Sequence, residues 1–254
     1  MRLALQIQFD GTLYAGWQKQ AQDMSVQQKL EEVFKYLCQE DFTITGCGRT
    51  DSGVHARYFI CHLDVSMEQA ERINTETLNR LLPADISVDS IWITPDEFHA
   101  RFDANHRKYI YRIAYHKNPF NRIDHFNFRA AENLELIEQE ELMSLLLELK
   151  DFKSFAKSNS GLEHFVCHLS ECVWKKTEQG IDLHIAANRF VRGMVRLVVG
   201  TFLNLAQEKI SLSEIKEAIE SGLPIPKAWS VPANGLTLEE VGYPEEIRKI
   251  WERI

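Results

Sequence analysis

A short glycine-rich stretch, GCGRTDSGVHA at residues 46–56, contains the residue types best suited to chemistry in this chain. Its three glycines allow the backbone to bend or to approach a ligand closely, so that Asp51 projects from a turn between two expected strands. Arg49 lies two residues earlier, and a guanidinium beside a carboxylate keeps it ionised, as a nucleophile or general base requires. The structural alternative is an Asx turn closed by Asp51 beside a solvated Arg49.

A second group is the run NRFVRGMVRLVVGTFLNL, for which the apolar spacing predicts a helix over residues 189–207. Arg189, Arg192 and Arg196 would then share one stripe of this helix, while most of the remaining positions are apolar. Three arginines on a largely buried helix need anionic partners. Those partners are either structural carboxylates, or phosphates together with a catalytic aspartate.

The segment RKYIYRIAYH, residues 107–116, combines basic and aromatic residues as base-stacking surfaces do. It contains Arg107, Lys108, Tyr109 and Tyr111. Aromatic residues at a spacing of two are also typical of the core face of a strand, so at most one tyrosine need be functional. Histidines and cysteines cluster elsewhere without a familiar zinc spacing, and we expect no metal.

Composition limits the possible settings for this chemistry. The 254 residues are 44% hydrophobic, enough for a proper core, and the formal net charge of −8 argues against diffuse attraction to a polyanion. An RNA-binding role would therefore need basic residues gathered on one face. The five cysteines are scattered, and no apolar run reaches signal-peptide or membrane-span length, so we expect reduced thiols, no membrane association and a cytoplasmic location.

The elements that must position these residues follow the order β-α-β-β-α-β, and we expect this order to recur in the second half. In the first half, the expected strands are 2–9, 42–47, 58–65 and 86–93, and the expected helices are 25–40 and 66–82. In the second half, the expected strands are 108–116, 165–174, 181–187 and 235–241, and the expected helices are 134–149, 189–207 and 211–221. The polar stretch 157–164 is the best candidate for a mobile loop.

This pattern predicts an α+β fold made of two ferredoxin-like units. We expect the units to share a mixed, mainly antiparallel sheet, with helices packed on one side and a cleft between them. Residues 1–104 would form an N-terminal subdomain that carries the aspartate loop. Residues 105–254 would form a C-terminal subdomain that carries the tyrosine strand and the arginine helix.

Seven sequence blocks, in this order from residue 9 to residue 244, resemble the tRNA pseudouridine synthase A (TruA) family. They are FDGTLYAGWQ, GRTDSGVHA, PADI, FHARF, KYIY, FVRGMVR and GLTLEEVGYP. The resemblance implies an isomerase that converts uridine to pseudouridine at positions 38, 39 and 40, in the anticodon stem-loop of tRNA. It also implies a homodimer that uses neither a metal nor a cofactor.

By the same resemblance, Asp51 matches the catalytic aspartate, Tyr109 the tyrosine that stacks on the target base, and Arg196 the arginine that pairs with the aspartate. Arg49 matches an arginine associated with holding the base flipped out. We further expect contacts to RNA from residues near these positions, namely Arg192, Arg189, Arg107, Lys108 and His55.

Two features depart from the family pattern. Residue 52 is Ser where Ala is more usual, and its hydroxyl could hydrogen-bond to Asp51. The region 157–175 lacks the expected basic and threonine-rich character, which bears on site selection rather than on the reaction class. Two other classes of function remain open. One is a non-catalytic RNA-binding protein on the same fold, and the other is a glycoside hydrolase, which would need a second acid beside Asp51.

Overall fold

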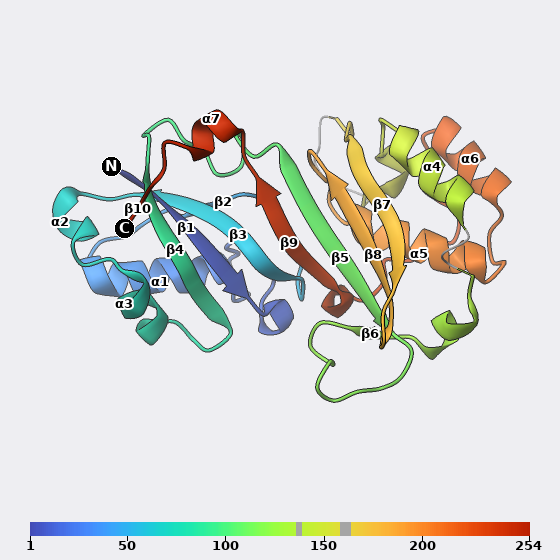
Figure 1. Cartoon of the computed structure of the whole chain (residues 1–254), viewed down its shortest axis with the longest axis horizontal. Helices are drawn as coiled ribbons and strands as arrows, with labels where there is room; N and C mark the ends of the chain where they lie inside the picture. The colour runs from blue at the N-terminus through green and yellow to red at the C-terminus, as the bar shows by residue number, and fades with distance from the viewer. Residues whose placement is uncertain (136–138, 158–163) are drawn as a thin grey trace. The chain divides into compact units, whose positions relative to one another are not determined.

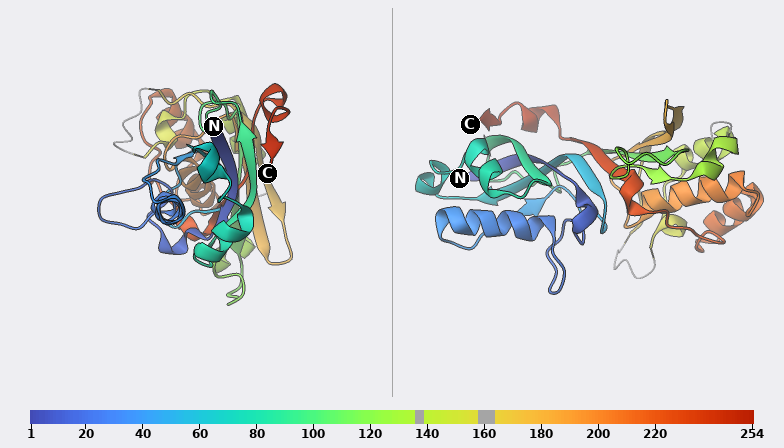
Figure 2. Two further views of the ribbon diagram at one scale, coloured as in Figure 1. Left: turned by 90° about the vertical axis from the view of Figure 1, so that its left-hand side faces the viewer. Right: turned by 90° about the horizontal axis from the view of Figure 1, so that it is seen from below.

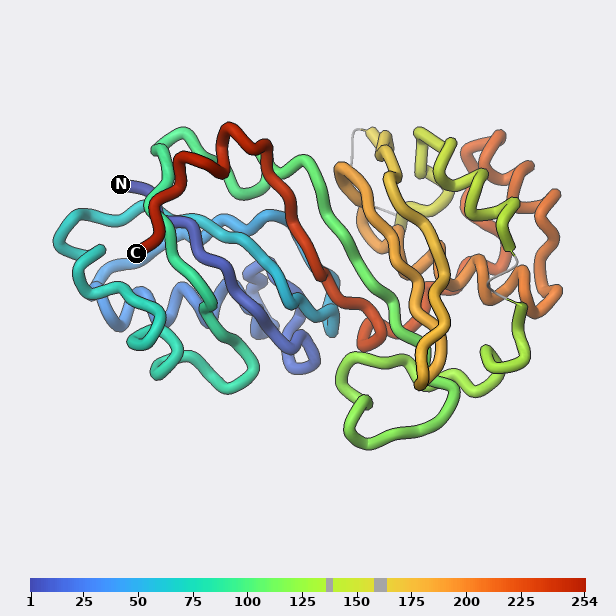
Figure 3. The backbone as a smooth tube through the Cα atoms, viewed as in Figure 1, coloured from blue at the N-terminus to red at the C-terminus, as the bar shows by residue number. Residues whose placement is uncertain are grey.

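The computed structural model describes residues 1–135, 139–157 and 164–254, which fold as two compact units (Figure 1). The first unit consists of Met1–Arg107 and Thr237–Ile254, and the second of Lys108–Leu236. Figure 3 traces the return of the C-terminal segment to the strands of the first unit. Our sequence-based division at residue 104 had placed that segment with the second half, and as a division into functional domains it stays a prediction.

The first unit is built around a sheet in the order β10-β4-β1-β3-β9, with β2 beside β3. Its strands are β1 (Arg2–Phe9), β2 (Thr45–Gly46), β3 (His55–Asp64), β4 (Ile86–Thr94), β9 (Leu236–Gly242) and β10 (Glu252–Arg253). Its helices are η1 (Gly11–Leu13), α1 (Val26–Cys38), α2 (Met67–Ala70), α3 (Thr75–Leu81) and α7 (Glu245–Arg248). The pair β3–β9 is parallel, whereas β1 is antiparallel to β3 and to β4.

The core of this unit lies between the central strand β1 and the helix α1, which covers one face of the sheet (Figure 2). Leu3, Leu5 and Ile7 alternate along β1 and are fully buried. Leu30 and Phe34 project from α1 at helical spacing and are also fully buried. The period of two in the strand and the period near 3.6 in the helix therefore meet in one apolar layer.

The second unit contains a sheet in the order β5-β8-β7, with β6 parallel to β5. Its strands are β5 (His106–Ala114), β6 (Phe126–Asn127), β7 (Leu169–Lys176) and β8 (Gly180–Ala187). Its helices are η2 (Arg129–Asn133), α4 (Glu140–Glu148), η4 (Lys153–Phe155), α5 (Met194–Ala206), α6 (Leu212–Glu220) and η5 (Ala233–Gly235). The helix α5 is apolar on most of its surface and packs within this unit, where Val198, Val199 and Phe202 are fully buried.

The predicted α+β class is confirmed, with ten strands and seven α-helices in the described part of the chain, and the sheet pairing is mixed and mainly antiparallel. All five cysteines are free thiols. Over the residues described, no helix is long and apolar enough to cross a membrane. The loop expected to be mobile, 157–164, falls largely outside the described residues.

Three expected elements differ from those observed. The single helix predicted over 66–82 is two helices, because Asn74 caps a new one by accepting a hydrogen bond from the backbone N–H of Thr77 at 2.9 Å. The strand predicted over 42–47 shortens to β2. The helix predicted to begin at residue 134 begins at Glu140, after Leu134 has ended η2.

The second predicted helix of the second half, 189–207, also begins later than expected. Gly193 has a φ of 75° and serves as the N-cap of α5, which begins at Met194 rather than at residue 189. A left-handed backbone angle at this point separates the preceding residues from the helix. Arg189 and Arg192 therefore lie in the loop before α5, and the expected three-arginine helical stripe is wrong.

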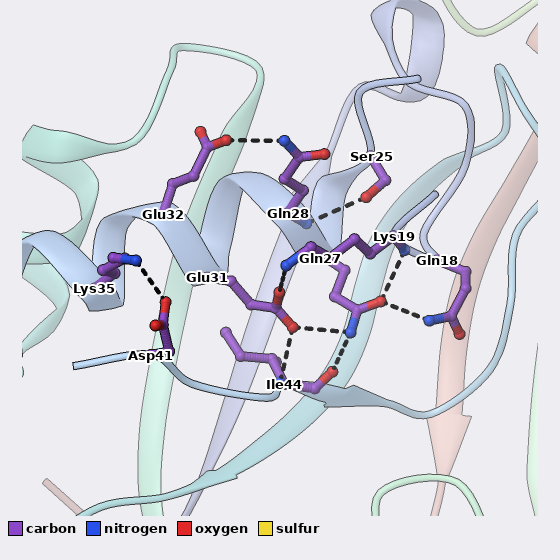
Figure 4. A network of polar contacts seen from close by, with 10 residues as sticks. All are labelled: Gln18, Lys19, Ser25, Gln27, Gln28, Glu31, Glu32, Lys35, Asp41 and Ile44. Carbon is purple, nitrogen blue, oxygen red and sulfur yellow. Dashed lines mark hydrogen bonds and ion pairs between the residues drawn. The ribbon is translucent and has the colours of Figure 1, made fainter. Parts of the chain in front are cut away.

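A buried polar network joins α1 to two segments beside it (Figure 4). The carboxylate of Glu31 accepts hydrogen bonds from Gln27 Nε2 at 3.0 Å, from the backbone N–H of Ile44 at 3.2 Å and from Lys19 Nζ at 2.9 Å. Gln27 in turn accepts from the N–H of Lys19 at 2.9 Å and donates to the carbonyl of Ile44 at 3.0 Å. Gln27 and Glu31 thus satisfy backbone groups of the chain on either side of the helix.

We expect Glu31→Ala to lower the free energy of unfolding by about 1–3 kcal/mol, because the Ile44 N–H and one of the two Gln27 amide hydrogens lose their acceptor. Urea unfolding followed by circular dichroism measures the change. The matched control is Glu32→Ala, one position along the same helix, where the carboxylate is largely exposed and pairs with Lys29. Its effect should stay within about 0.5 kcal/mol. Equal losses in the two variants would show that the network does not carry this stability.

Candidate active site

The Asp51 loop, residues 47–54, connects β2 to β3 in the first unit. Asp51 is partly exposed at the turn, and its carbonyl accepts a hydrogen bond from the backbone N–H of Val54 at 3.2 Å. Arg49, two residues earlier, is exposed. The loop therefore presents a carboxylate and a guanidinium on one short turn, and the hydrogen bond between Val54 and Asp51 closes this turn.

The segment Asp10–Trp17 holds this loop in place through hydrogen bonds on both sides of Asp51. On one side, the buried hydroxyl of Thr50 accepts a hydrogen bond from the N–H of Trp17 at 3.1 Å. On the other side, the N–H of Gly53 donates to the carbonyl of Tyr14 at 3.2 Å. The Ser52 hydroxyl also donates to this carbonyl, at 3.2 Å. Asp51 is therefore held at both of its chain neighbours.

Two glycines permit this close approach. Gly16 has a φ of 90°, and a Cβ added there would lie 2.2 Å from the carbonyl oxygen of Thr50. A Cβ added at Gly11 would lie 2.0 Å from the carbonyl oxygen of Val54. No side chain fits at such distances, so glycine is required at both positions for the segment to lie against the loop.

His55 closes the far end of the loop and is only 4% exposed. Its Nδ1 accepts a hydrogen bond from the N–H of Gly11 at 3.0 Å, which places the ring proton on Nε2. Asp10 Oδ1 lies 3.0 Å from the same nitrogen but takes its hydrogens from the N–H and the hydroxyl of Thr12. Burial sets His55 apart from the exposed residues expected to contact RNA, and its contacts are those of a residue that positions the loop.

Arg107 also serves the backbone around this loop. Its guanidinium donates to the carbonyls of Cys47 at 3.0 Å, Ala104 at 2.8 Å and Arg101 at 2.9 Å. Cys47 is the residue at which the Asp51 loop begins. The guanidinium of Arg107 is therefore occupied by backbone carbonyls of its own unit, although we expected it to contact RNA.

In the second unit, Tyr109 on β5 is half-buried, and the edge of its ring meets Phe190 at a centroid distance of 5.2 Å and an interplanar angle of 88°. Tyr111, two residues on, is fully buried and donates its hydroxyl to the carbonyl of Pro232 at 2.8 Å. Burial raises the pKa of Tyr111 far above its ordinary value. Tyr111 is thus a core residue, and Tyr109 is the more accessible of the two tyrosines.

The basic residues expected in the second unit have different surroundings. Arg196 lies in the first turn of α5, half-buried, and its Nε donates to the carbonyl of Val231 at 2.6 Å. Lys108 is paired with Glu171 at 2.6 Å, so its charge is largely balanced within the unit. Arg189 contacts His164 at 2.9 Å, and Arg192 is exposed.

The structure thus gathers Asp51, Arg49, Arg107 and His55 in the first unit, and it places Tyr109 and Arg196 in the second. The pairing of Asp51 with Arg196 stays a prediction. Sequence reasoning gave no role to the residues that fix the Asp51 loop: Gly11, Tyr14, Gly16 and Thr50. The available signal was the FDGTLYAGWQ block, whose two glycines are the residues that allow the close approach.

Comparisons with known proteins identify the family of this chain. The family model described as tRNA pseudouridine synthase matches residues 5–103 and 144–244. A protein named tRNA pseudouridine synthase A from Azobacteroides pseudotrichonymphae is 39% identical, over 98% of this chain and 99% of its own length. Proteins of the same name from Bacteroides thetaiotaomicron and Chlorobium phaeobacteroides are 37% and 32% identical, over 97% and 95% of this chain and 92% and 93% of their own lengths. This chain therefore belongs to the tRNA pseudouridine synthase family.

Proposed function

We propose that this chain isomerises uridine to pseudouridine in the anticodon stem-loop of tRNA, at positions 38, 39 and 40, and that Asp51 performs the chemistry. Membership of the tRNA pseudouridine synthase family supports the reaction and the class of RNA. The observation that carries the assignment to Asp51 is the fixation of its loop on both sides, by Trp17 at Thr50 and by Tyr14 at Gly53. A carboxylate that reacts with a sugar carbon must be held in position before the substrate arrives.

The reaction breaks the bond between ribose C1′ and uracil N1, turns the base while it is held, and joins C1′ to C5. The proton on C5 is then lost, and N1 gains a proton. Asp51 has two possible routes. In one, its carboxylate attacks C1′ to form an ester, as the nucleophile of a retaining glycosidase does. In the other, it assists loss of the 2′ proton to give a glycal.

Both routes require Asp51 to be ionised in a site closed to water. A desolvated carboxylate without a cationic partner would take up a proton instead, and we assign the role of partner to Arg196. Flipping the target base out of its stack costs a few kcal/mol, part of which is returned when the base stacks on the ring of Tyr109. Arg49, exposed on the Asp51 loop, is suited to hold the flipped base.

The remaining parts of the proposal concern the setting of the reaction. We propose that the enzyme acts as a homodimer in the cytoplasm. RNA binding would use the exposed arginines rather than the total charge, which is −8. Lys108 and Arg107 contribute less to RNA binding than their charges suggest, because Glu171 and three backbone carbonyls occupy them.

Asp51→Ala should abolish pseudouridine formation, because the proposal assigns the reaction at C1′ to this carboxylate, and it should leave tRNA affinity within about threefold of the wild-type value. Carbodiimide labelling of pseudouridine followed by primer extension, on tRNA from cells that carry the wild-type or the variant protein, measures the product, and filter binding measures affinity. Asp10→Ala, also at the loop, is a control for general disturbance, since its carboxylate caps Thr12. Full activity of Asp51→Ala would support the non-catalytic RNA-binding alternative.

Tyr109 can be tested in two ways with two substitutions. Tyr109→Leu should lower the rate by about tenfold to a hundredfold, because base stacking on an aromatic ring contributes about 1–3 kcal/mol. Tyr109→Phe keeps the ring and removes only the phenol. If the phenol also accepts the proton from C5, the phenylalanine variant should be as impaired as the leucine variant in single-turnover assays. A fully active Tyr109→Phe enzyme would exclude the phenol as an essential base.

Affinity for tRNA should fall steeply with salt, because arginine contacts to phosphates release counterions. We expect the logarithm of the association constant to decline linearly with the logarithm of salt concentration, and each phosphate-contacting arginine replaced by glutamine should reduce the slope by about one. Arg192→Gln, at an exposed position, is the test variant, and Lys216→Gln on α6, where the lysine pairs with Glu141, is its control. An affinity that stays constant from low to moderate salt would contradict the electrostatic part of the proposal.

A further inference from the structure

The FHARFD segment between β4 and β5, residues 98–103, has no role in the chemistry described above. It contains both buried and exposed residues. Phe98 and Ala100 are buried in the first unit, whereas Arg101 and Phe102 face the solvent. Phe102 is 74% exposed, which is unusual for so large an apolar side chain in an ordered turn.

The ring of Phe102 is held in place rather than left free. It stacks on His99 with a centroid distance of 4.1 Å and an interplanar angle of 29°. The guanidinium carbon of Arg101 lies 5.7 Å from the Phe102 centroid. His99, Arg101 and Phe102 together form an aromatic platform, in which an imidazole stacks on a phenyl ring and a guanidinium lies over the same ring at the longer distance.

The platform has a rigid foundation. Nδ1 of His99 accepts hydrogen bonds from the N–H groups of Arg101 at 3.1 Å and Phe102 at 3.2 Å, which fixes the imidazole against the turn. Asp103 accepts from the N–H of His99 at 2.8 Å. The geometry of the exposed ring is thus set by the hydrogen bonds of its own turn.

A second set of contacts anchors the turn to the first unit. The N–H of Ala100 donates to Nδ1 of His62 at 3.1 Å, and its carbonyl accepts from the hydroxyl of Tyr243 at 2.7 Å. Burial lowers the pKa of His62 to about 4, so this imidazole is neutral and remains an acceptor at neutral pH. The turn that carries the platform is consequently attached to the same unit as the Asp51 loop.

Arg107 connects the platform directly to the Asp51 loop. The same guanidinium donates to the carbonyl of Arg101, in the platform, and to the carbonyl of Cys47, four residues before Asp51 in the chain. The platform and the Asp51 loop are therefore linked through the guanidinium of Arg107 within the first unit.

An accessible aromatic face with a guanidinium beside it matches the chemistry of an unpaired nucleotide, whose base stacks on rings and whose phosphate attracts a cation. A contact with another protein would more typically use a continuous apolar patch. Here the residues that flank Phe102 in the chain are polar, Arg101 on one side and Asp103 on the other. RNA is therefore favoured over protein as the occupant.

We propose that the aromatic platform of His99, Arg101 and Phe102 binds an unpaired base of the RNA substrate outside the reaction centre, by stacking on the ring of Phe102. This inference rests on the proposed function for the identity of the RNA. In this proposal, Phe102 contacts none of the reacting atoms. It acts by binding a nucleotide that flanks the target uridine.

The test uses the full-length protein and an anticodon stem-loop RNA that carries 2-aminopurine at one loop position at a time. The fluorescence of 2-aminopurine falls when it stacks on an aromatic ring. Wild-type protein should lower the fluorescence at one position, and Phe102→Ala should remove that change and weaken RNA binding by about tenfold to a hundredfold. Phe102→Tyr, which keeps the ring, should retain both the quenching and the affinity.

The matched control is Phe120→Ala, which removes a phenylalanine that is 93% exposed in the second unit. It should bind RNA as the wild-type protein does. Equal losses in Phe102→Ala and Phe120→Ala, or wild-type affinity and fluorescence in Phe102→Ala, would overturn the proposal. A changed oligomeric state of Phe102→Ala with unaltered RNA fluorescence would overturn it too and assign the ring to a protein interface. Pseudouridine formation by the wild-type enzyme is measured separately, so that failure of the proposed function is distinguishable from failure of the platform.

Discussion

The attachment of the Asp51 loop to the segment Asp10–Trp17 is the constraint on which the rest of the first unit depends. Loops are the more mobile parts of a fold, yet a reacting carboxylate must be placed within a fraction of an ångström. In this chain, Asp51 is flanked by two hydrogen bonds, one accepted by the Thr50 hydroxyl and one donated by the backbone N–H of Gly53. The carboxylate itself remains partly exposed and available to a substrate.

The helix α1 extends this constraint into the core. The first N–H groups of the helix, at Val26 and Gln27, donate to the carbonyls of Gly16 and Trp17 at 3.2 and 3.1 Å. The side chains of Gln27 and Glu31 then reach Lys19 and Ile44, which lie just beyond the segment and just before the loop. The helix α1 is thereby hydrogen-bonded to both segments that lead to the Asp51 loop, and its apolar side packs on the sheet. Destabilising this helix would disturb the site without touching it.

Much of the fold follows from patterns that are local in the sequence. The elements that were not predicted correctly are those for which residue spacing gives no local signal. Alternation predicted β1 and β3, and the serine cap predicted the start of α6, where Ser211 and Glu214 form a complete capping box. The start of α5 was missed because the positive φ of Gly193 cannot be read from an apolar spacing that continues through it. The short elements α7 and β10 were missed because four-residue and two-residue segments carry no measurable period.

The same distinction applies to the site. Asp51 and Arg49 could be selected from the sequence, since glycine-flanked charged residues are a local signal. The bond between Trp17 and Thr50 could not, because it joins residues 33 positions apart.

The charges of the basic residues also have to be divided between structure and binding. Arg107 is used by backbone carbonyls, Lys108 by Glu171, and Arg2 by Asp64 at 2.8 Å. A cation paired with a carboxylate, as Lys108 and Arg2 are, adds little to the attraction of a polyanion. The neutral carbonyls around Arg107 do not balance its charge, but they engage N–H groups that could otherwise contact a phosphate. Fewer basic side chains can therefore contact RNA directly than the sequence suggests. With a net charge of −8, non-specific attraction is weak, and affinity must come from a few exposed arginines together with aromatic stacking. Under the proposed function, recognition would rest on the shape and unpaired bases of the RNA, which is the form of selectivity that a base-flipping enzyme needs.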